Sequence, residues 1–75
     1  MRTFIALHRR DVHRGGYLDC LVWARQKAAS EPTKPALVLT CRPGDKAARV
    51  VAEVTAKEER IILEGRLVPI RKLRP

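Results

Sequence analysis

The sequence has few cysteines and no long apolar run. Two cysteines in 75 residues are far fewer than in secreted scaffolds that disulfides hold together. No stretch approaches the roughly 18 apolar residues that cross a bilayer. The apolar run at residues 4–7 is too short for the core of a signal peptide, and Arg9 and Arg10 follow it. We therefore expect a cytoplasmic protein in which Cys20 and Cys41 are reduced and buried.

Motifs for metals, phosphates or covalent catalysis are also missing. His8, His13, Cys20 and Cys41 are of types that bind zinc, but no C-x₂-C or H-x₃-H pair brings two of them together. A catalytic cysteine needs an orienting third group and a cleft, which a chain of this size rarely provides. The glycine pair at residues 15–16 lacks the spacing of a phosphate-binding loop. The sequence predicts a non-enzymatic protein with no metal and no cofactor.

Positive charge is what the sequence has in excess. Lys and Arg number 16 against eight Asp and Glu, which gives a formal net charge of +8. Residues 1–30 carry six basic and two acidic residues, residues 31–65 carry six of each, and residues 66–75 carry four basic residues and no acid. Eleven of the 16 are arginine, which favours bidentate contacts to anions. The excess charge is thus confined to the two ends of the sequence.

The length of the chain supports one hydrophobic core, so we expect a single small domain over residues 1–75. Apolar residues make up 45% of it, which argues against a disordered basic tail. At this size the burial of apolar surface and the loss of conformational entropy nearly cancel. Self-association is therefore expected as a way to stabilise the fold.

Short apolar segments between prolines and glycines predict a mostly β protein. The predicted strands cover residues 3–8, 17–25, 36–41, 47–57, 60–64 and 67–70. Residues 9–16 are polar and end in two glycines, so they are expected to form a loop. Pro69 lacks an N–H, which places the last strand at the edge of a sheet.

Two segments are compatible with both kinds of secondary structure. Residues 17–29 have apolar side chains at helical spacing, but the run at 20–24 suits a strand buried on both faces, and we favour a strand over 17–25. Residues 47–57 fit a helical stripe as well as an alternating strand, and three valines and a threonine favour the strand. The alternative is an α+β protein with helices near residues 17–29 and 46–59.

The second half of the chain resembles a known fold. A turn at residues 43–45, a strand over 49–55, a return strand over 61–64 and a closing segment over 67–75 follow one another. In this order they resemble the second half of a small SH3-like β-barrel of the KOW type, over residues 43–75. The resemblance implies a small SH3-like five-stranded barrel of a kind that associates with nucleic acids.

The basic residues point to nucleic acid as the partner, with DNA and RNA both open. If the first strand lies near the last, the two basic ends form one face that contacts phosphates. Trp23 and Tyr17 are candidates for stacking on unpaired bases. A core of this size needs most of the three aromatic residues, so Phe4 belongs to the core and the core is also the favoured place for Trp23. The chain has no Asn and one Gln, so little sequence specificity is expected. The predicted nucleic-acid-binding residues are Arg9, Arg10, Arg14, Trp23, Arg66, Arg71, Lys72 and Arg74.

A second hypothesis is a protein-interaction module or a homo-oligomer. The apolar edge segment at residues 67–70 invites pairing with another chain, and the positive charge would then serve solubility. A membrane partner is not expected, because Arg25 and Lys27 alone do not make residues 17–29 a basic amphipathic helix.

Overall fold

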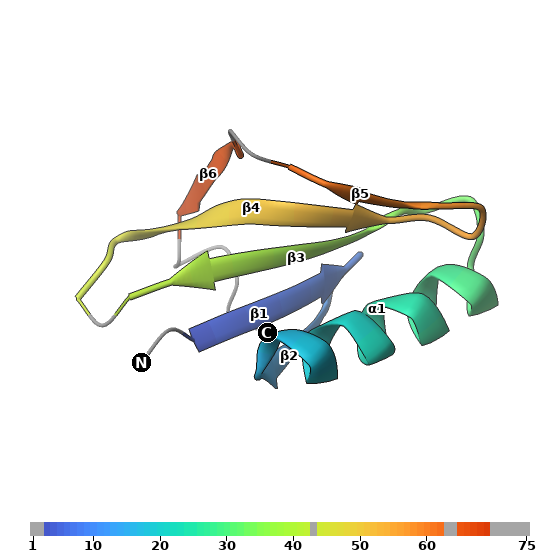
Figure 1. Ribbon diagram of the computed structural model, residues 1–75, viewed down its shortest axis with the longest axis horizontal. Coiled ribbons are helices and arrows are strands. Elements are labelled where there is room, and N and C mark those ends of the chain that lie inside the picture. Colours follow the sequence, from blue (N-terminus) through green and yellow to red (C-terminus); the bar gives the residue numbers. More distant parts are fainter. Residues whose placement is uncertain (1–2, 43, 63–64, 70–75) are drawn as a thin grey trace.

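The structure combines one helix with a six-stranded antiparallel sheet (Figure 1). The computed structural model describes residues 3–42, 44–62 and 65–69. Its elements are β1 (Thr3–His8), β2 (Asp11–Gly15), α1 (Tyr17–Ser30), β3 (Ala36–Cys41), β4 (Ala47–Val54), β5 (Glu59–Ile61) and β6 (Leu67–Pro69). The prediction of a small, mostly β protein is confirmed.

The strands follow the order β2–β1–β3–β4–β5, and β6 pairs with β4 as well. β5 lies beside residues 52–54 and β6 beside residues 47–49, so both occupy one edge of β4. Among the described residues β1 pairs with β2 and β3 and β6 pairs with β4, so the first strand does not pair beside the last, which was the condition for one basic face. The sheet is not closed, and a five-stranded barrel is not confirmed.

Residues 17–30 form a helix, so the predicted strand over 17–25 is wrong. β2 and β3 both run antiparallel to β1, and the chain must cross β1 to connect them. A connection between strands of the same direction needs a dozen or more residues and is usually helical. Within the apolar run at 20–24, Val22 is exposed, so the run lacks the two buried faces of an internal strand. The buried side chains of α1 are Cys20, Leu21, Ala24 and Ala28.

The predictions for residues 9–16 and 47–57 can also be compared with the structure. Residues 11–15, expected to lie in a loop, form the edge strand β2. Val12 is the one large apolar side chain of this strand, so pairing with β1 orders a segment that shows no apolar alternation. Residues 47–54 form β4 as predicted, with every second side chain buried, so the alternative helix over 46–59 is wrong.

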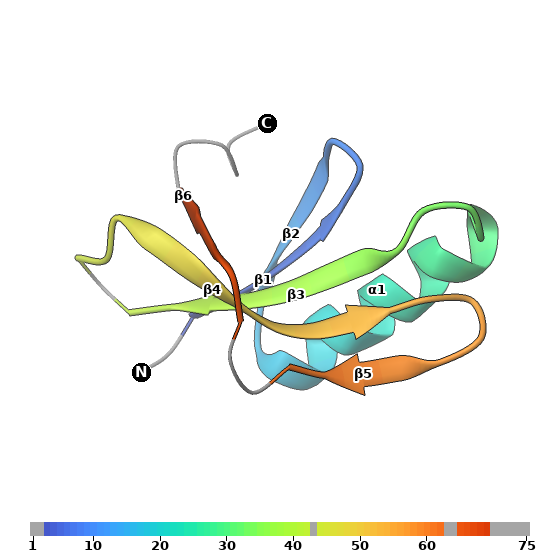
Figure 2. The same ribbon diagram turned by 90° about the horizontal axis from the view of Figure 1, so that it is seen from above.

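Hydrophobic clusters lie on both faces of the sheet. On one face, α1 packs on small side chains, among them Ala6, Ala36, Val38 and Ala52, and we call this group the helix-side cluster. On the other face, a buried cluster of Ile5, Leu39, Ala48 and Val50 has Val12 of β2 and Val68 of β6 packed against it. Figure 2 shows β2 and β6 turning toward the same side of the central strands. Two opposite edges of the sheet therefore border one face.

Gly65 lets the chain pass close beside β4 on its way to β6. A Cβ atom at this position would lie 1.7 Å from the carbonyl oxygen of Val50. The N–H of Val50 donates to the carbonyl oxygen of Arg66 at 3.1 Å, which holds the two segments together. Among the described strands β6 pairs with β4 alone, in agreement with the edge position predicted from Pro69.

Candidate nucleic-acid interface

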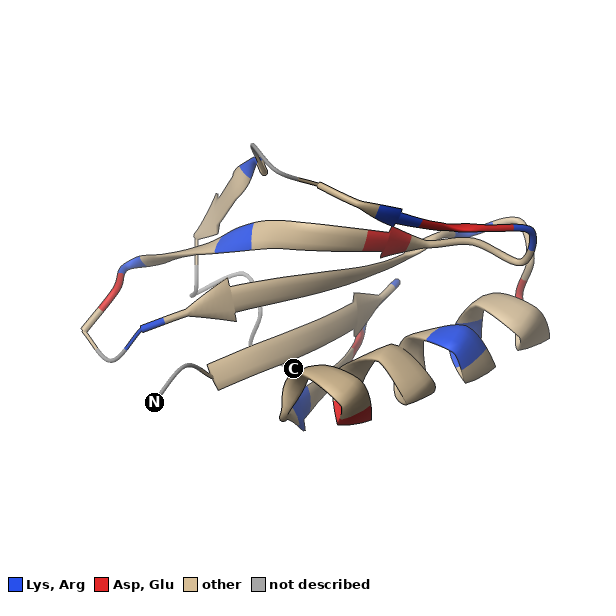
Figure 3. Ribbon diagram, viewed as in Figure 1, with Lys and Arg blue, Asp and Glu red and all other residues tan. Residues whose placement is uncertain are grey.

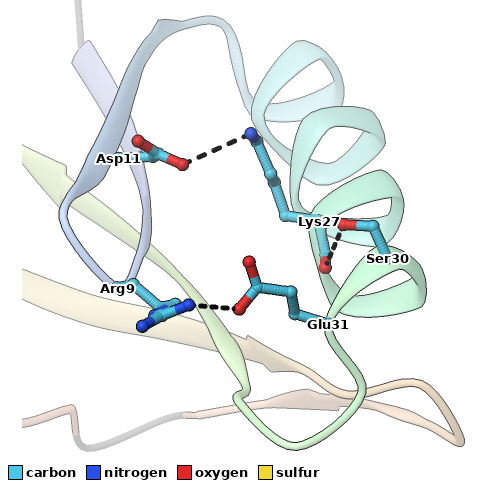
Figure 4. Close-up of polar contacts among 5 residues, drawn as sticks. All are labelled: Arg9, Asp11, Lys27, Ser30 and Glu31. Atoms are coloured by element: carbon cyan, nitrogen blue, oxygen red, sulfur yellow. Dashed lines mark hydrogen bonds and ion pairs between the residues drawn. The ribbon is translucent and has the colours of Figure 1, made fainter.

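Arg9 and Arg10 form the two-residue turn between β1 and β2, because His8 pairs with Asp11. Arg9 has a positive φ of 58°, and its Nη1 donates to Oε2 of Glu31 at 2.6 Å (Figure 4). A shallow groove of about 590 Å³ lies beside this turn. Its lining residues are Arg9, Arg10, Asp11, Glu31, Lys34 and Pro35. Neither Arg10 nor Lys34 forms an ion pair with another described residue, so both remain available to an external anion.

Trp23 of α1 lies against β2. Its side chain is half-buried and packs on the helix-side cluster. The indole ring stacks on the ring of His13, with 5.6 Å between centroids and 12° between planes, and Nζ of Lys27 lies 5.4 Å from the indole centroid. Nζ of Lys27 also donates to Oδ2 of Asp11 at 3.3 Å (Figure 4). Trp23 is thus shared between the core and a basic surface.

Tyr17 is held differently from Trp23. Its ring contacts Phe4, with 5.2 Å between centroids and 59° between planes. Both side chains are half-buried and pack on the helix-side cluster, as expected for Phe4.

Arg14 and Arg66 stand at opposite ends of one row across the sheet. The strand register places Arg14, Ile5, Leu39 and Val50 side by side, and Val50 is bonded to the Arg66 backbone. Both arginines are exposed. The two predicted basic regions therefore lie at the two edges of the sheet and do not come together on neighbouring strands.

Four of the eight predicted residues gather at the β2 edge of the molecule. Together with Lys27 they form what we call the β2-edge surface: Arg9, Arg10, Arg14, Trp23 and Lys27. Arg66 lies at the β4 edge, where β6 begins. Arg71, Lys72 and Arg74 lie outside the described residues.

Three basic residues that the sequence analysis did not single out line a second groove, at the turn end of the β3–β4 hairpin: Arg42, Lys46 and Arg49. The charge count did not point to them, because the basic and acidic residues of segment 31–65 are equal in number. The fold separates these charges, since Glu53, Glu58 and Glu59 lie toward the other end of β4 (Figure 3). The predicted turn at residues 43–45, between the predicted strands over 36–41 and 47–57, was the signal that could have brought Arg42 and Arg49 together.

The thiol of Cys20 is a poor nucleophile. Burial raises the pKa of the Cys20 thiol, and the nearby Asp19 carboxylate raises it further, which disfavours the thiolate. Arg25 of α1 donates to both carboxylate oxygens of Glu59 on β5, with 3.2 Å between Nη2 and Oε2. These hydrogen bonds lower the pKa of Glu59 and raise that of Arg25, so this pair ties the helix to an edge strand.

Comparison with protein-family models, with curated proteins and with solved structures finds no match. The resemblance of residues 43–75 to a KOW-type half-barrel therefore stays a prediction. Within residues 3–42, 44–62 and 65–69, no group of three or more His, Cys, Asp or Glu side chains is placed to hold a metal ion. No helix in this part of the chain has the length and apolar character needed to cross a membrane.

Proposed function

We propose that the protein binds nucleic acid through phosphate contacts, without catalysis and with little sequence specificity. The observation that carries the proposal is the β2-edge surface, where Lys27 lies over the half-buried Trp23 and Arg9, Arg10 and Arg14 follow along the β1–β2 hairpin. Asp11 and Glu31, the acids of the adjoining groove, are engaged by Lys27 and Arg9. Arg10 and Arg14 form no ion pair with another described residue, and their guanidinium groups match phosphate geometry.

The remaining predicted contacts extend the same proposal. Arg66 would add a phosphate contact at the other edge of the sheet, with Arg71, Lys72 and Arg74 following it in the sequence. The resemblance of residues 43–75 to an SH3-like barrel points in the same direction, because domains of that type associate with nucleic acids. Specificity for bases is expected to be weak, since a chain without Asn and with one Gln has few side chains for base readout.

The test measures the binding of the protein to mixed-sequence DNA duplex, RNA duplex and single strands. Fluorescence anisotropy reports the binding constant at each of a series of salt concentrations. Contacts to about five phosphates predict a slope of log K against log salt of about −4 to −5 on duplex DNA. The Arg10→Gln/Arg14→Gln variant should flatten the slope by about 1.8, for two lost phosphate contacts. The matched control, Lys57→Gln/Arg60→Gln, removes the same charge from the β4–β5 hairpin and should leave the slope unchanged. Absence of binding at about 50 mM salt and micromolar protein contradicts the proposal.

Self-association is the second candidate, favoured by apolar side chains that the fold leaves in solvent. Leu18 is 73% exposed and Val22 is 48% exposed, one helical turn apart on α1. Ile61 on the edge strand β5 is 75% exposed. Size-exclusion chromatography with light scattering distinguishes the candidates: a stable dimer without salt-dependent affinity for nucleic acid favours self-association.

A further inference from the structure

The second basic groove, the hairpin groove, lies far along the sheet from the β1–β2 turn. β3 pairs with β1 so that Cys41 faces Thr3 at the start of β1, whereas the turn follows His8 at its end. The β3–β4 hairpin extends past this starting end of β1 (Figure 1). Its lining includes Thr40, Arg42, Asp45, Lys46, Arg49 and Leu67.

The charges of the hairpin groove are unbalanced. None of Arg42, Lys46 and Arg49 forms an ion pair with another described residue. The one carboxylate in the lining, that of Asp45, accepts a hydrogen bond from the backbone N–H of Arg42 at 2.7 Å. Asp45 thus closes the turn of the hairpin, and its one negative charge faces three positive ones.

The walls of the groove combine these cations with apolar surface. The register places Thr40, Arg49 and Leu67 in one row across β3, β4 and β6, and Leu67 is 58% exposed. The groove encloses about 770 Å³, which is within the size range of sites for small organic ligands. Two arginines and a lysine suit the oxygens of a phosphate, and the apolar wall suits the sugar or base attached to it.

We infer that the hairpin groove is a second phosphate-binding site, separate from the β2-edge surface, and that it holds a phosphate of a nucleotide chain. The inference rests on the proposed function for the choice of a nucleic acid as ligand. The cluster of Arg42, Lys46 and Arg49 is independent of that choice, since it shares no residue with the β2-edge surface.

The experiment follows the backbone amides of the ¹⁵N-labelled full chain during titration with a short mixed-sequence DNA duplex and, separately, with inorganic phosphate. We expect the duplex to shift the amides of Arg42, Lys46 and Arg49 in addition to those of Arg10 and Arg14. The Arg42→Gln/Lys46→Gln variant should flatten the slope of log K against log salt by about 1.8, for two lost phosphate contacts. The control variant Lys57→Gln/Arg60→Gln, which also exchanges one exposed lysine and one exposed arginine, should not change the slope.

The outcomes separate this inference from the proposed function. Duplex-induced shifts at Arg10 and Arg14 with none in the hairpin groove overturn the second site and leave the proposed function standing. Shifts in the groove with inorganic phosphate, and no binding of DNA duplex, RNA duplex or single strands, overturn the proposed function. They also overturn the nucleotide chain as the ligand of the groove and favour a small phosphate compound instead. An equal change of slope in the groove variant and the control variant also overturns the inference, because charge alone would then explain it.

Discussion

Arg9 and Glu31 connect the β1–β2 turn to the residue that ends α1, through an ion pair of 2.6 Å between Nη1 and Oε2. Both side chains are well exposed, so the pair stabilises the fold by at most about 1 kcal/mol. Arg9 occupies this position at a φ of 58°, which costs a residue with a Cβ atom about 1 kcal/mol. Because these two contributions nearly cancel, Arg9 fixes where the turn lies without adding to the stability of the protein.

Glycine at position 9 should therefore be better tolerated than alanine. Arg9→Gly and Arg9→Ala both lose the ion pair with Glu31, but glycine adopts a positive φ without strain. We expect the glycine variant to exceed the alanine variant by about 1 kcal/mol in free energy of unfolding, measured by urea denaturation. Equal stability of the two variants would show that the turn relaxes around alanine.

Gly65 should be the least replaceable of the described glycines. Gly65→Ala places a Cβ against the carbonyl oxygen of Val50, and the backbone beside β4 must move to accept it. We expect a loss of about 2 kcal/mol or more in thermal or urea unfolding. The control is Gly16→Ala, where no atom lies within 4 Å of the new Cβ, and it should cost under about 1 kcal/mol. Similar losses in both variants would contradict the close approach of Gly65 to β4.

Local sequence patterns were sufficient to predict a strand where polar residues or prolines mark both of its ends. β1 and β3 have the predicted limits, since each is a short apolar run next to polar or proline residues. The prediction of a strand at the position of α1 was wrong because the helix is required by the directions of the neighbouring strands, which the segment itself does not encode. Only the arrangement of β2 and β3 as strands of the same direction requires a crossing connection there. β2 was not predicted because its sequence has no apolar alternation, and it is ordered by pairing with β1.

The candidate site was predictable to a similar degree. Arg9, Arg10 and Arg14 are close in the sequence, so a hairpin keeps them close in space. The position of Trp23 beside His13 of β2 depends on α1 packing against β2, which no strand at residues 17–25 would have produced. The hairpin groove was hidden by counting charge along the sequence, because such a count does not show which end of a strand each charge occupies.

His8 is buried, and its Nε2 has no hydrogen-bond partner. Leucine has a similar volume and no polar atom to leave unpaired, so His8→Leu should raise the free energy of unfolding by about 1 kcal/mol. His8→Ala is the companion variant, which opens a cavity and should lower the free energy of unfolding by about 2 kcal/mol. Destabilisation by His8→Leu in urea unfolding would mean that the imidazole is bonded in solution.

The two cysteines should react at different rates with a thiol reagent. Cys20 is fully buried and its thiol pKa is raised by that burial, so little thiolate forms and the reagent cannot reach it. Cys41 is half-buried and should react first. We expect one fast and one slow thiol in the folded protein, and a slow thiol alone in Cys41→Ser. Fast labelling of folded Cys41→Ser would contradict the burial of Cys20.

The ion pair between Arg25 and Glu59 should make stability depend on pH in the acid range. Its hydrogen bonds lower the pKa of Glu59 in the folded state, so the unfolded chain binds the proton more readily. The stabilisation is therefore fully present above the ordinary glutamate pKa of about 4.3 and is lost as the pH falls through the lower folded-state value. Glu59→Gln removes this dependence, so its free energy of unfolding should lie below that of the unmodified chain near neutral pH and converge with it in strong acid.

Glu58→Gln is the matched control, since the Glu58 side chain forms no ion pair with another described residue. A difference for Glu59→Gln that stays constant across the acid range would show that Glu59 stabilises the fold through packing, without a contribution from its charge.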